Sequence, residues 1–278
     1  MRMANGELMT TEKTISLEID GRCLQAAEGM TVLEVARREG VPIPTLCHHE
    51  AVEPAGACRL CLVEITHPDW RGWKGLVTSC LYPVEEGLQV TTDNAEIRNA
   101  RRTVLDLLLA RCPGSNVIQR LAAEYGLTTT SFRKNEVETT CILCGLCVRV
   151  CAVKGCSAIG TAGRGINKAI AIPFKQPPPD CIGCASCAHI CPTGAIEYED
   201  TAEVRQIWGH TFELVKCSSC GRPVMPQRQL EYEAAKAGLD PDYFKTCPDC
   251  SRAKTVETMR TAFDAQAAKP GGLAKVAG

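Results

Sequence analysis

Residues 141–151 read CILCGLCVRVC, and residues 181–191 read CIGCASCAHIC. Both stretches have the spacing C-x2-C-x2-C-x3-C, so each cysteine of the first recurs 40 residues later in the second. Three cysteines on one tight loop can bind three corners of a cube-shaped metal cluster, and the fourth corner then needs a ligand from elsewhere. In runs of this spacing that ligand is the fourth cysteine of the other run. The repeat therefore predicts two clusters whose ligands cross over between the runs.

The repeat is typical of bacterial two-cluster ferredoxins, which hold [4Fe–4S] clusters. Eight cysteines at this spacing argue against zinc and against redox-active thiols. We expect one cluster on Cys141, Cys144, Cys147 and Cys191, and the other on Cys151, Cys181, Cys184 and Cys187. Gly145 and Gly183 are expected where the backbone passes close to the clusters, because glycine has no side chain to crowd them.

The composition indicates a metalloprotein in a reducing compartment. The 278 residues include 19 cysteines but only 5% aromatic residues, so something other than a large aromatic core holds the chain together. Residues 1–13 lack the apolar stretch of a secretory signal, and no run approaches the roughly 20 apolar residues of a membrane span. We therefore expect a cytoplasmic protein with no membrane span, whose closely spaced cysteines bind metal. A net charge of −1 disfavours nucleic-acid binding.

The N-terminal segment predicts two paired strands and a short helix. Residues 14–20 alternate apolar and polar side chains, and Asp20-Gly21 is a hairpin signal that leads into residues 22–26. Thr31 followed by Glu34 forms a capping-box signature, which predicts a helix that begins there and ends at Gly40. This order of elements favours a β-grasp domain.

A cysteine set follows these elements, consisting of Cys47, Cys58, Cys61 and Cys80. Residues 62–65 form another expected strand directly after the third cysteine. Plant-type [2Fe–2S] ferredoxins have C-x4-C-x2-C and a distant fourth cysteine, whereas the first gap here is ten residues and the last eighteen. By spacing alone zinc stays an alternative to a [2Fe–2S] cluster, since four thiolates suit it equally well.

Longer stretches carry a resemblance to a known family. Residues 44–65 (PTLCHHEAVEPAGACRLCLVEI), 78–92 (TSCLYPVEEGLQVTT) and 156–174 (CSAIGTAGRGINKAIAIPF) are the most similar. They resemble the N-terminal part of the large iron–sulfur subunit of complex I, of iron-only hydrogenases, and of the small diaphorase subunits of NAD-linked hydrogenases and formate dehydrogenases. The resemblance covers roughly residues 13–200 and implies a [2Fe–2S] cluster on Cys47, Cys58, Cys61 and Cys80.

One stretch departs from that family. Many members hold a further [4Fe–4S] cluster on one histidine and three cysteines after the [2Fe–2S] domain, but residues 97–126 contain only Cys112 and no histidine. We expect a helical spacer without a cluster. Its first helix is expected to be capped by Asp93 with Glu96, and its second to run from Ser115 to Gly126.

The last cysteine set lies outside the resemblance and consists of Cys217, Cys220, Cys247 and Cys250. Two C-x2-C pairs with a long insertion fit a zinc ribbon, in which four thiolates hold Zn²⁺ tetrahedrally. A further iron–sulfur cluster and a reactive dithiol are the alternatives. Residues 229–237 are expected to form a helix between the pairs, ended by Gly238. Zinc has no redox chemistry, so the metal decides whether this module carries electrons.

The remaining cysteines and a histidine pair receive simpler interpretations. Cys23 and Cys156 are expected to be buried small residues, and Cys112 is interpreted as filler and not as a ligand. His48 and His49 are interpreted as ordinary loop residues beside a ligand.

Together these patterns predict an α+β protein of four modules and a tail. They are a β-grasp [2Fe–2S] ferredoxin domain (13–92), a helical spacer (93–136), a two-cluster [4Fe–4S] ferredoxin domain (137–203), a zinc-ribbon-like module with four cysteines (207–260) and a disordered tail (261–278). The predicted cofactors are one [2Fe–2S] cluster, two [4Fe–4S] clusters and one Zn²⁺.

No nucleophile–base pair, nucleotide-phosphate motif or flavin site is visible, so the sequence indicates a carrier of electrons. We expect the iron–sulfur subunit of an NAD(P)-linked oxidoreductase complex. The resemblance implies a flavoprotein partner with FMN and NAD(P)H, and a catalytic partner that is a hydrogenase, a formate dehydrogenase or an electron-bifurcating or transhydrogenase module. Ferredoxin is a further possible partner. The alternatives are a free multi-cluster ferredoxin and an iron–sulfur redox sensor or interaction protein.

Overall fold

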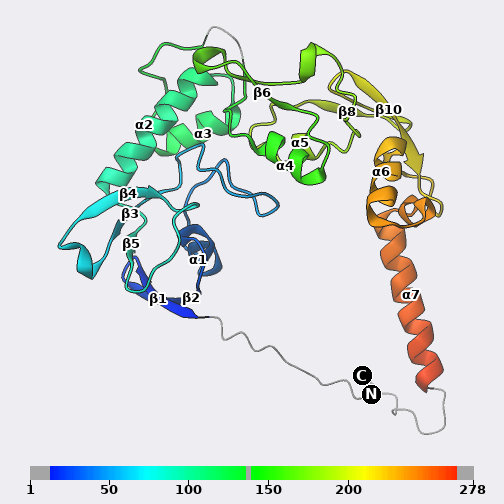
Figure 1. The fold of residues 1–278 in the computed structure, drawn as a ribbon, viewed down its shortest axis with the longest axis horizontal. Helices are drawn as coiled ribbons and strands as arrows, with labels where there is room; N and C mark the ends of the chain where they lie inside the picture. Colours follow the sequence, from blue (N-terminus) through cyan, green and yellow to red (C-terminus); the bar gives the residue numbers. More distant parts are fainter. Residues whose placement is uncertain (1–12, 136–138, 268–278) are drawn as a thin grey trace. The chain divides into compact units, whose positions relative to one another are not determined.

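The computed structural model describes residues 13–135 and 139–267, which form two compact units (Figure 1). The first unit takes in the described residues up to Gly155 together with Gly160–Ala171 and Ser186–Ile196. The second comprises Cys156–Ile159, Ile172–Ala185 and the described residues from Glu197 onward. The predicted [4Fe–4S] segment, residues 137–203, is therefore divided between the two units.

A five-stranded mixed sheet forms the base of the first unit. Its strands are β1 (Thr14–Ile19), β2 (Arg22–Ala27), β3 (Leu62–Thr66), β4 (Lys74–Thr78) and β5 (Gln89–Thr91). The order is β2-β1-β5-β3-β4, in which β1 and β5 are parallel and the other neighbours antiparallel. Asp20 and Gly21 both adopt left-handed backbone conformations between β1 and β2, which confirms the predicted hairpin.

Helix α1 (Val32–Arg38) closes the core over this sheet. Thr31 Oγ1 accepts a hydrogen bond from the Glu34 backbone, and the Glu34 carboxylate accepts one from the Thr31 backbone, so the predicted capping box is confirmed. The helix buries Val32, Leu33 and Val35 against the alternate inward side chains of the strands. A 3₁₀ turn, η1 (Pro68–Trp70), lies between β3 and β4.

Two helices form the spacer, α2 (Ala95–Arg111) and α3 (Asn116–Glu124), and they pack against each other. Ser115 caps α3 as predicted. The predicted cap of α2 is wrong, because Asn94 and not Asp93 accepts the hydrogen bond from the Ile97 backbone, at 2.8 Å. The Asp93 carboxylate lies on the surface instead, where it pairs with Arg98.

Short elements complete the first unit. They are α4 (Leu146–Lys154), β6 (Gly160–Ala162), η2 (Gly165–Asn167), β7 (Ala169–Ala171) and α5 (Ser186–His189). Strands β6 and β7 form a two-stranded sheet, while α4 packs against α5. These two helices each begin inside one of the repeated cysteine runs.

The second unit contains a four-stranded antiparallel sheet and two longer helices. Its elements are η3 (Pro173–Lys175), β8 (Tyr198–Asp200), β9 (Val204–Ile207), β10 (His210–Lys216), β11 (Pro223–Pro226), α6 (Gln227–Ala237), η4 (Pro241–Lys245) and α7 (Pro248–Ala267). The strand order is β11-β10-β9-β8. Helix α6 ends at Gly238, which adopts a left-handed conformation, as the sequence predicted.

Two predicted boundaries differ from the structure. The division between residues 203 and 207 falls within the four-stranded sheet, since β9 pairs with both β8 and β10. The tail predicted to be disordered from residue 261 is helical through Ala267. Ala, Met, Arg and Gln favour a helix, so α7 continues beyond the predicted end. Residues 268–278 lie outside the described residues.

The mixed α+β class is confirmed. Among the described residues, no helix is both long and apolar enough to cross a membrane.

Candidate iron–sulfur and metal centres

The N-terminal cysteine set is buried between the sheet and its loops. Cys47 follows α1, Cys58 and Cys61 precede β3, and Cys80 follows β4. The exposed fractions are 1% for Cys47, 8% for Cys58, 1% for Cys61 and 1% for Cys80. Four thiols that come from segments far apart in the sequence therefore share one interior site, which excludes bulk water.

Within this site the cysteines form two close pairs. The Cys58 backbone N–H donates to Cys47 Sγ at 3.3 Å, and the Sγ atoms of Cys61 and Cys80 lie 3.4 Å apart. Hydrogen bonding from the Cys47 thiol lowers the pKa of Cys58 to about 6, and the Cys80 thiol does the same for Cys61. The shared proton raises the pKa of Cys47 and of Cys80 in return, and burial adds to that rise. Each pair therefore favours one thiolate, the form that binds metal.

Backbone contacts hold the loops around these pairs. Ser79 donates to the Cys61 carbonyl from its backbone N–H at 3.0 Å and from its hydroxyl at 2.9 Å. Gly56, in the loop between Cys47 and Cys58, has a φ of +59°, and a Cβ there would lie 2.5 Å from the Leu81 side chain. A larger residue at position 56 would therefore strain this loop.

The histidine pair beside Cys47 makes specific contacts. The Arg37 guanidinium lies 2.9 Å from His48 Nδ1, and His49 Nδ1 accepts from the Ala51 backbone at 3.1 Å. Burial, followed by the positive charge of Arg37, lowers the pKa of His48. Both histidines stabilise the loop, which agrees with their interpretation as loop residues.

The two repeated runs share one backbone conformation. Leu143 and Gly145 have φ values of +55° and +74°, and their counterparts 40 residues later, Gly183 and Ala185, have +72° and +56°. Each run thus has left-handed residues at the same two positions. Glycine occupies the second of these positions in the first run and the first of them in the second run. The sequence indicated the two glycines but missed Leu143 and Ala185, which adopt the same conformation at some cost in strain.

Four cysteines of the first predicted [4Fe–4S] set lie within the first unit. Burial raises the pKa of Cys144, and the charges of Cys191 and Cys141 add to this rise. Burial also raises the pKa of Cys147 to about 12, with the thiols of Cys144 and Cys141 contributing. The Ala195 backbone N–H donates to Cys191 Sγ at 3.3 Å. The charge of Cys191 acts on the thiol of Cys144, and the assignment of this ligand set stays a prediction.

The second predicted set is divided between the units. Cys151 and Cys187 belong to the first unit, whereas Cys181 and Cys184 belong to the second. In the second unit Arg205 on β9 donates to the Gly183 carbonyl at 3.0 Å and pairs with Asp200 at 2.7 Å, which anchors the loop between Cys181 and Cys184 to the sheet. The ligand assignment of this cluster stays a prediction.

Three unassigned cysteines differ from their simple interpretations. Cys112 is fully buried, and its thiol donates to the Cys141 carbonyl at 3.1 Å, so it supports a predicted ligand loop and is more than filler. Burial raises its pKa to about 11, which keeps it protonated. Cys23 was predicted to be buried but is exposed, because it lies on the outward face of the edge strand β2. Cys156 is half-buried.

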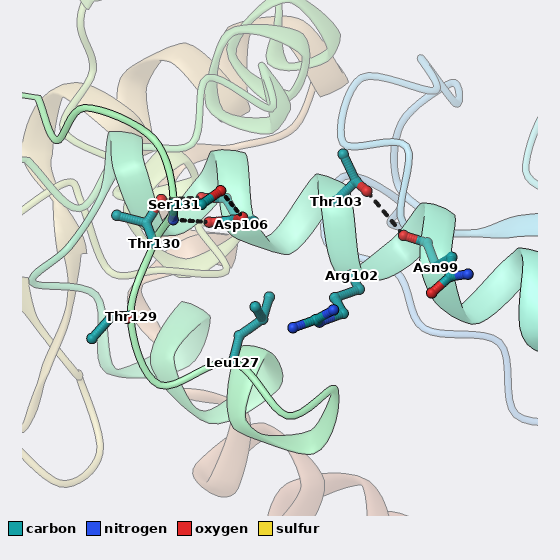
Figure 2. Close-up of a pocket in the computed structure, with 8 residues that line it drawn as sticks. All are labelled: Asn99, Arg102, Thr103, Asp106, Leu127, Thr129, Thr130 and Ser131. Carbon is teal, nitrogen blue, oxygen red and sulfur yellow. Dashed lines mark hydrogen bonds between the residues drawn. The ribbon is translucent and has the colours of Figure 1, made fainter.

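The spacer pocket offers no soft ligand for an iron–sulfur cluster. Figure 2 shows it between α2 and the segment after α3, where Ser131 donates to the Asp106 carboxylate from its backbone at 2.9 Å and from its hydroxyl at 2.6 Å. The pocket has a volume of about 460 Å³. Its lining residues are Asn99, Arg102, Thr103, Asp106, Leu127, Thr129, Thr130 and Ser131, which include neither histidine nor cysteine.

The C-terminal cysteine set forms a compact site. Cys217 and Cys220 lie between β10 and β11, while Cys247 and Cys250 lie at the start of α7. All four Sγ atoms lie within 4.8 Å of one another. A tetrahedral zinc with bonds of about 2.3 Å separates its sulfurs by roughly 3.8 Å, so the site fits a single metal ion. Elsewhere in the described chain, no three cysteine, histidine or acidic ligands meet this distance.

Hydrogen bonds to sulfur favour the thiolate form of Cys217 and Cys220 in this compact site. The Cys247 backbone N–H donates to Cys217 Sγ at 3.3 Å, and this bond is the largest cause that lowers the pKa of Cys217 to about 6. Arg222 donates to Cys220 Sγ at 3.4 Å and to Cys247 Sγ at 3.8 Å. Its guanidinium lowers the pKa of Cys220. A positive group thus lies directly against two candidate ligands.

Comparisons with known proteins agree with the N-terminal site. Residues 12–95 match the family described as "2Fe-2S iron-sulfur cluster binding domain". The chain is 32% identical over 222 residues to the NADP-reducing hydrogenase subunit HndD of Solidesulfovibrio fructosivorans, covering 68% of this chain and 37% of that protein. It is 31% identical over 251 residues to the NADPH-Fe(3+) oxidoreductase subunit alpha of Geobacter sulfurreducens, covering 81% of this chain and 28% of that protein.

Two further relatives extend this similarity. A subunit of an NADH-quinone oxidoreductase of Rhizobium meliloti is 32% identical over 233 residues, covering 74% of this chain and 27% of that protein. A chain of the crystal structure of an NAD⁺-reducing [NiFe]-hydrogenase in the H2-reduced state matches with a TM-score of 0.57 and 27% identity, covering 81% of this chain and 99% of that chain. The chain spans only about a third of the length of the curated relatives, but the resemblance predicted from sequence is confirmed.

Proposed function

We propose that this protein is the electron-transfer subunit of an NAD(P)-linked, multi-subunit oxidoreductase. The observation that carries the proposal is the buried N-terminal site, where two close cysteine pairs lie inside the segment that matches a [2Fe–2S] domain. Three further cysteine sets along the same chain would supply ligands for more metal centres. The names of the relatives, which include a hydrogenase subunit and an NADH-quinone oxidoreductase subunit, support the same role.

The pairing of the N-terminal cysteines suits a binuclear cluster. A [2Fe–2S] cluster needs two thiolates on each iron. Cys47 with Cys58 would hold one iron, and Cys61 with Cys80 the other, because these are the pairs that lie together. The surrounding β-grasp layout would exclude water from the cluster through the burial of all four ligands.

The remaining ligands follow the crossed pattern of the repeat. Two [4Fe–4S] clusters would be held by Cys141, Cys144, Cys147 and Cys191, and by Cys151, Cys181, Cys184 and Cys187. The C-terminal module would hold one Zn²⁺ on Cys217, Cys220, Cys247 and Cys250, since the sulfur separation suits one ion. The helical spacer would carry no cluster, as its pocket lacks soft ligands.

These centres would make the chain a relay. Iron–sulfur clusters accept and release single electrons at potentials that depend on charge, hydrogen bonds to sulfur and solvent exposure. The protein's part would be to exclude water and to hold neighbouring ligand loops at a constant separation. Backbone N–H groups donate to Cys47 and Cys191, and arginine side chains bind the carbonyls of the ligand loops, in agreement with this role.

The proposed complex places one partner on each side of the relay. One would be a flavoprotein subunit that binds FMN and NAD(P)H, and the other a catalytic subunit such as a hydrogenase, a formate dehydrogenase or an electron-bifurcating module. Ferredoxin would be a further exchange partner. We place the complex in the cytoplasm, because the closely spaced thiols need a reducing compartment.

Metal analysis of anaerobically purified protein tests the cofactor content. We expect about ten iron atoms with matching acid-labile sulfide, and about one zinc, per chain. Twelve or more iron atoms without zinc would contradict the zinc assignment and extend the relay to the C-terminal module. Fewer than about eight would contradict the three-cluster relay.

Purification from the native host tests the assembly. A flavoprotein subunit that copurifies with the chain is expected. A single species of about 30.0 kDa on gel filtration would instead favour a free ferredoxin. Copurification with a partner that lacks flavin, and no electron transfer from NAD(P)H, would favour a redox sensor.

A further inference from the structure

One arginine contacts two predicted cluster-binding loops that are far apart in the sequence. Arg149 lies on α4, between the ligands Cys147 and Cys151. Its Nη2 donates to the Cys47 carbonyl at 2.9 Å and to the Cys144 carbonyl at 3.4 Å, and its Nη1 donates to the Glu53 carbonyl. Cys47 is 102 residues away from Arg149 along the chain, yet both belong to the first unit.

The charge of this arginine is not neutralised by a carboxylate. Among the described residues no aspartate or glutamate pairs with Arg149, and its three acceptors are neutral carbonyls. Its Nε is buried and makes no hydrogen bond in the described structure. A positive charge therefore lies against the carbonyls of both predicted ligand loops, and its field acts on a cluster bound there.

A second arginine provides a natural contrast. Arg111, at the end of α2, donates to the Cys141 carbonyl at 3.2 Å and to the Lys168 carbonyl at 3.2 Å. It supports the same [4Fe–4S] run as Arg149, but within the described chain it makes no hydrogen bond to the loop of Cys47. The two arginines thus differ in whether they also reach the N-terminal site.

We propose that Arg149 is a positioning residue that joins the [2Fe–2S] ligand loop to the first [4Fe–4S] ligand loop and stabilises the reduced state of both clusters. This rests on the function proposed above. With both clusters bound, an electron passing between them would oxidise one cluster by one unit and reduce the other by one unit. A positive charge held between the two loops favours the extra negative charge on whichever cluster carries the electron.

The test compares Arg149→Gln with Arg111→Gln in the full-length, cluster-loaded protein. Electron paramagnetic resonance during a redox titration gives the potential of each cluster separately. For Arg149→Gln we expect the reduced-to-oxidised ratio at a given ambient potential to fall about tenfold for both clusters, which is about 59 mV for one electron. Arg111→Gln should lower this ratio only for the [4Fe–4S] cluster that we assign to the loop of Cys141. Equal potentials in wild type and Arg149→Gln would overturn the proposal, as would a shift confined to one cluster.

Arg149→Lys separates the charge from the link between the loops. Lysine keeps the positive charge but cannot reach three carbonyls with a planar fork. We expect both potentials to stay near the wild-type values, while the magnetic interaction between the two reduced clusters weakens. An unchanged interaction would overturn the linking role. This variant also carries the test if Arg149→Gln fails to retain iron. A wild-type protein without a [2Fe–2S] or [4Fe–4S] signal would contradict the proposed function itself, which keeps the two failures distinct.

Discussion

The N-terminal and C-terminal cysteine sets each bring four thiols together, but they differ in compactness and burial. The C-terminal sulfurs all lie within 4.8 Å of one another, and Cys220 is exposed. The N-terminal cysteines are all buried and form two close pairs, and no three of them meet that distance. A single ion needs its ligands around one point, whereas a binuclear cluster inserts a second iron and bridging sulfides. Two sets with the same number of cysteines thus differ in how closely their sulfurs lie.

The surroundings of the two sets also differ: one set lies beside apolar side chains and the other beside a charged one. The N-terminal thiols lie beside the apolar core of α1 and the five-stranded sheet, where Cys61 and Cys80 are part of the cluster of buried residues. The C-terminal thiols have an arginine, Arg222, against two of their sulfurs. A fully buried site limits solvent access and suits a redox centre, whereas a partly exposed site leaves room for a surface charge beside its sulfurs.

Cysteine replacement gives the largest expected effect. Cys58→Ala should abolish the [2Fe–2S] electron paramagnetic resonance signal and stop electron flow through that centre, because one iron loses half of its protein ligands. Cys220→Ala should instead remove zinc and leave the iron content unchanged. Cys23→Ala is the matched control, since Cys23 is exposed and outside every set. Loss of iron in Cys220→Ala, or an intact [2Fe–2S] signal in Cys58→Ala, would break the comparison.

Acid sensitivity gives an intermediate effect. The Arg222 guanidinium lowers the pKa of Cys220, so Arg222→Gln should raise that pKa and let protons compete better for the thiolate. As the pH falls, the variant should therefore release zinc at a higher pH than the wild type. We expect a ten- to hundredfold loss of zinc affinity, which is typical of a lost contact to a metal ligand. Zinc release to a chromophoric chelator, followed across a pH series, measures both the loss of zinc affinity and the pH of release.

Arg252 supplies the control for that experiment. It binds the same carboxylate as Arg222, Asp249, at 2.5 Å, but within the described chain it donates to no sulfur. Arg252→Gln should leave the pH of zinc release close to the wild-type value. If both variants behave alike, the effect comes from Asp249 and not from the thiolate contact.

Helix capping gives the smallest expected effect. Asn94 caps α2, so Asn94→Ala should lower the free energy of unfolding of the first unit by about 1 kcal/mol without changing the metal content. Asp93→Ala should cost less, because its ion pair with Arg98 is exposed. Denaturant unfolding followed by circular dichroism measures both. A larger loss of unfolding free energy for Asp93→Ala would contradict the assignment of the cap. A change in metal content would show that the spacer affects the N-terminal site.

Local signals in the sequence predicted local structure well. Asp20-Gly21 predicted the hairpin, Thr31 with Glu34 predicted the capping box, and Gly238 predicted the end of α6. Each of these depends on a few neighbouring residues, so the sequence contains the whole cause. Asp93 and Asn94 both have a side-chain oxygen that can cap α2. Which of them caps the helix depended on the backbone conformation, which directs Asn94 toward the helix and Asp93 toward Arg98.

Contacts between distant segments were not predictable in this way. Nothing near Arg149 in the sequence indicates that it binds the Cys47 carbonyl, and nothing near Cys112 indicates its bond to the Cys141 carbonyl. Both involve backbone acceptors, which every residue possesses, so no residue type marks them. The exposed position of Cys23 likewise depended on which face of β2 packs on the core.

The sequence alone predicted which cysteines form one set, because ligands on one short loop must follow a spacing that matches the centre they bind. Only the folded chain showed how close the sulfurs of the N-terminal and C-terminal sets lie, which of their cysteines are buried, and which arginines contact their loops. These quantities depend on the packing of segments that are tens of residues apart, and packing is a property of the folded chain as a whole.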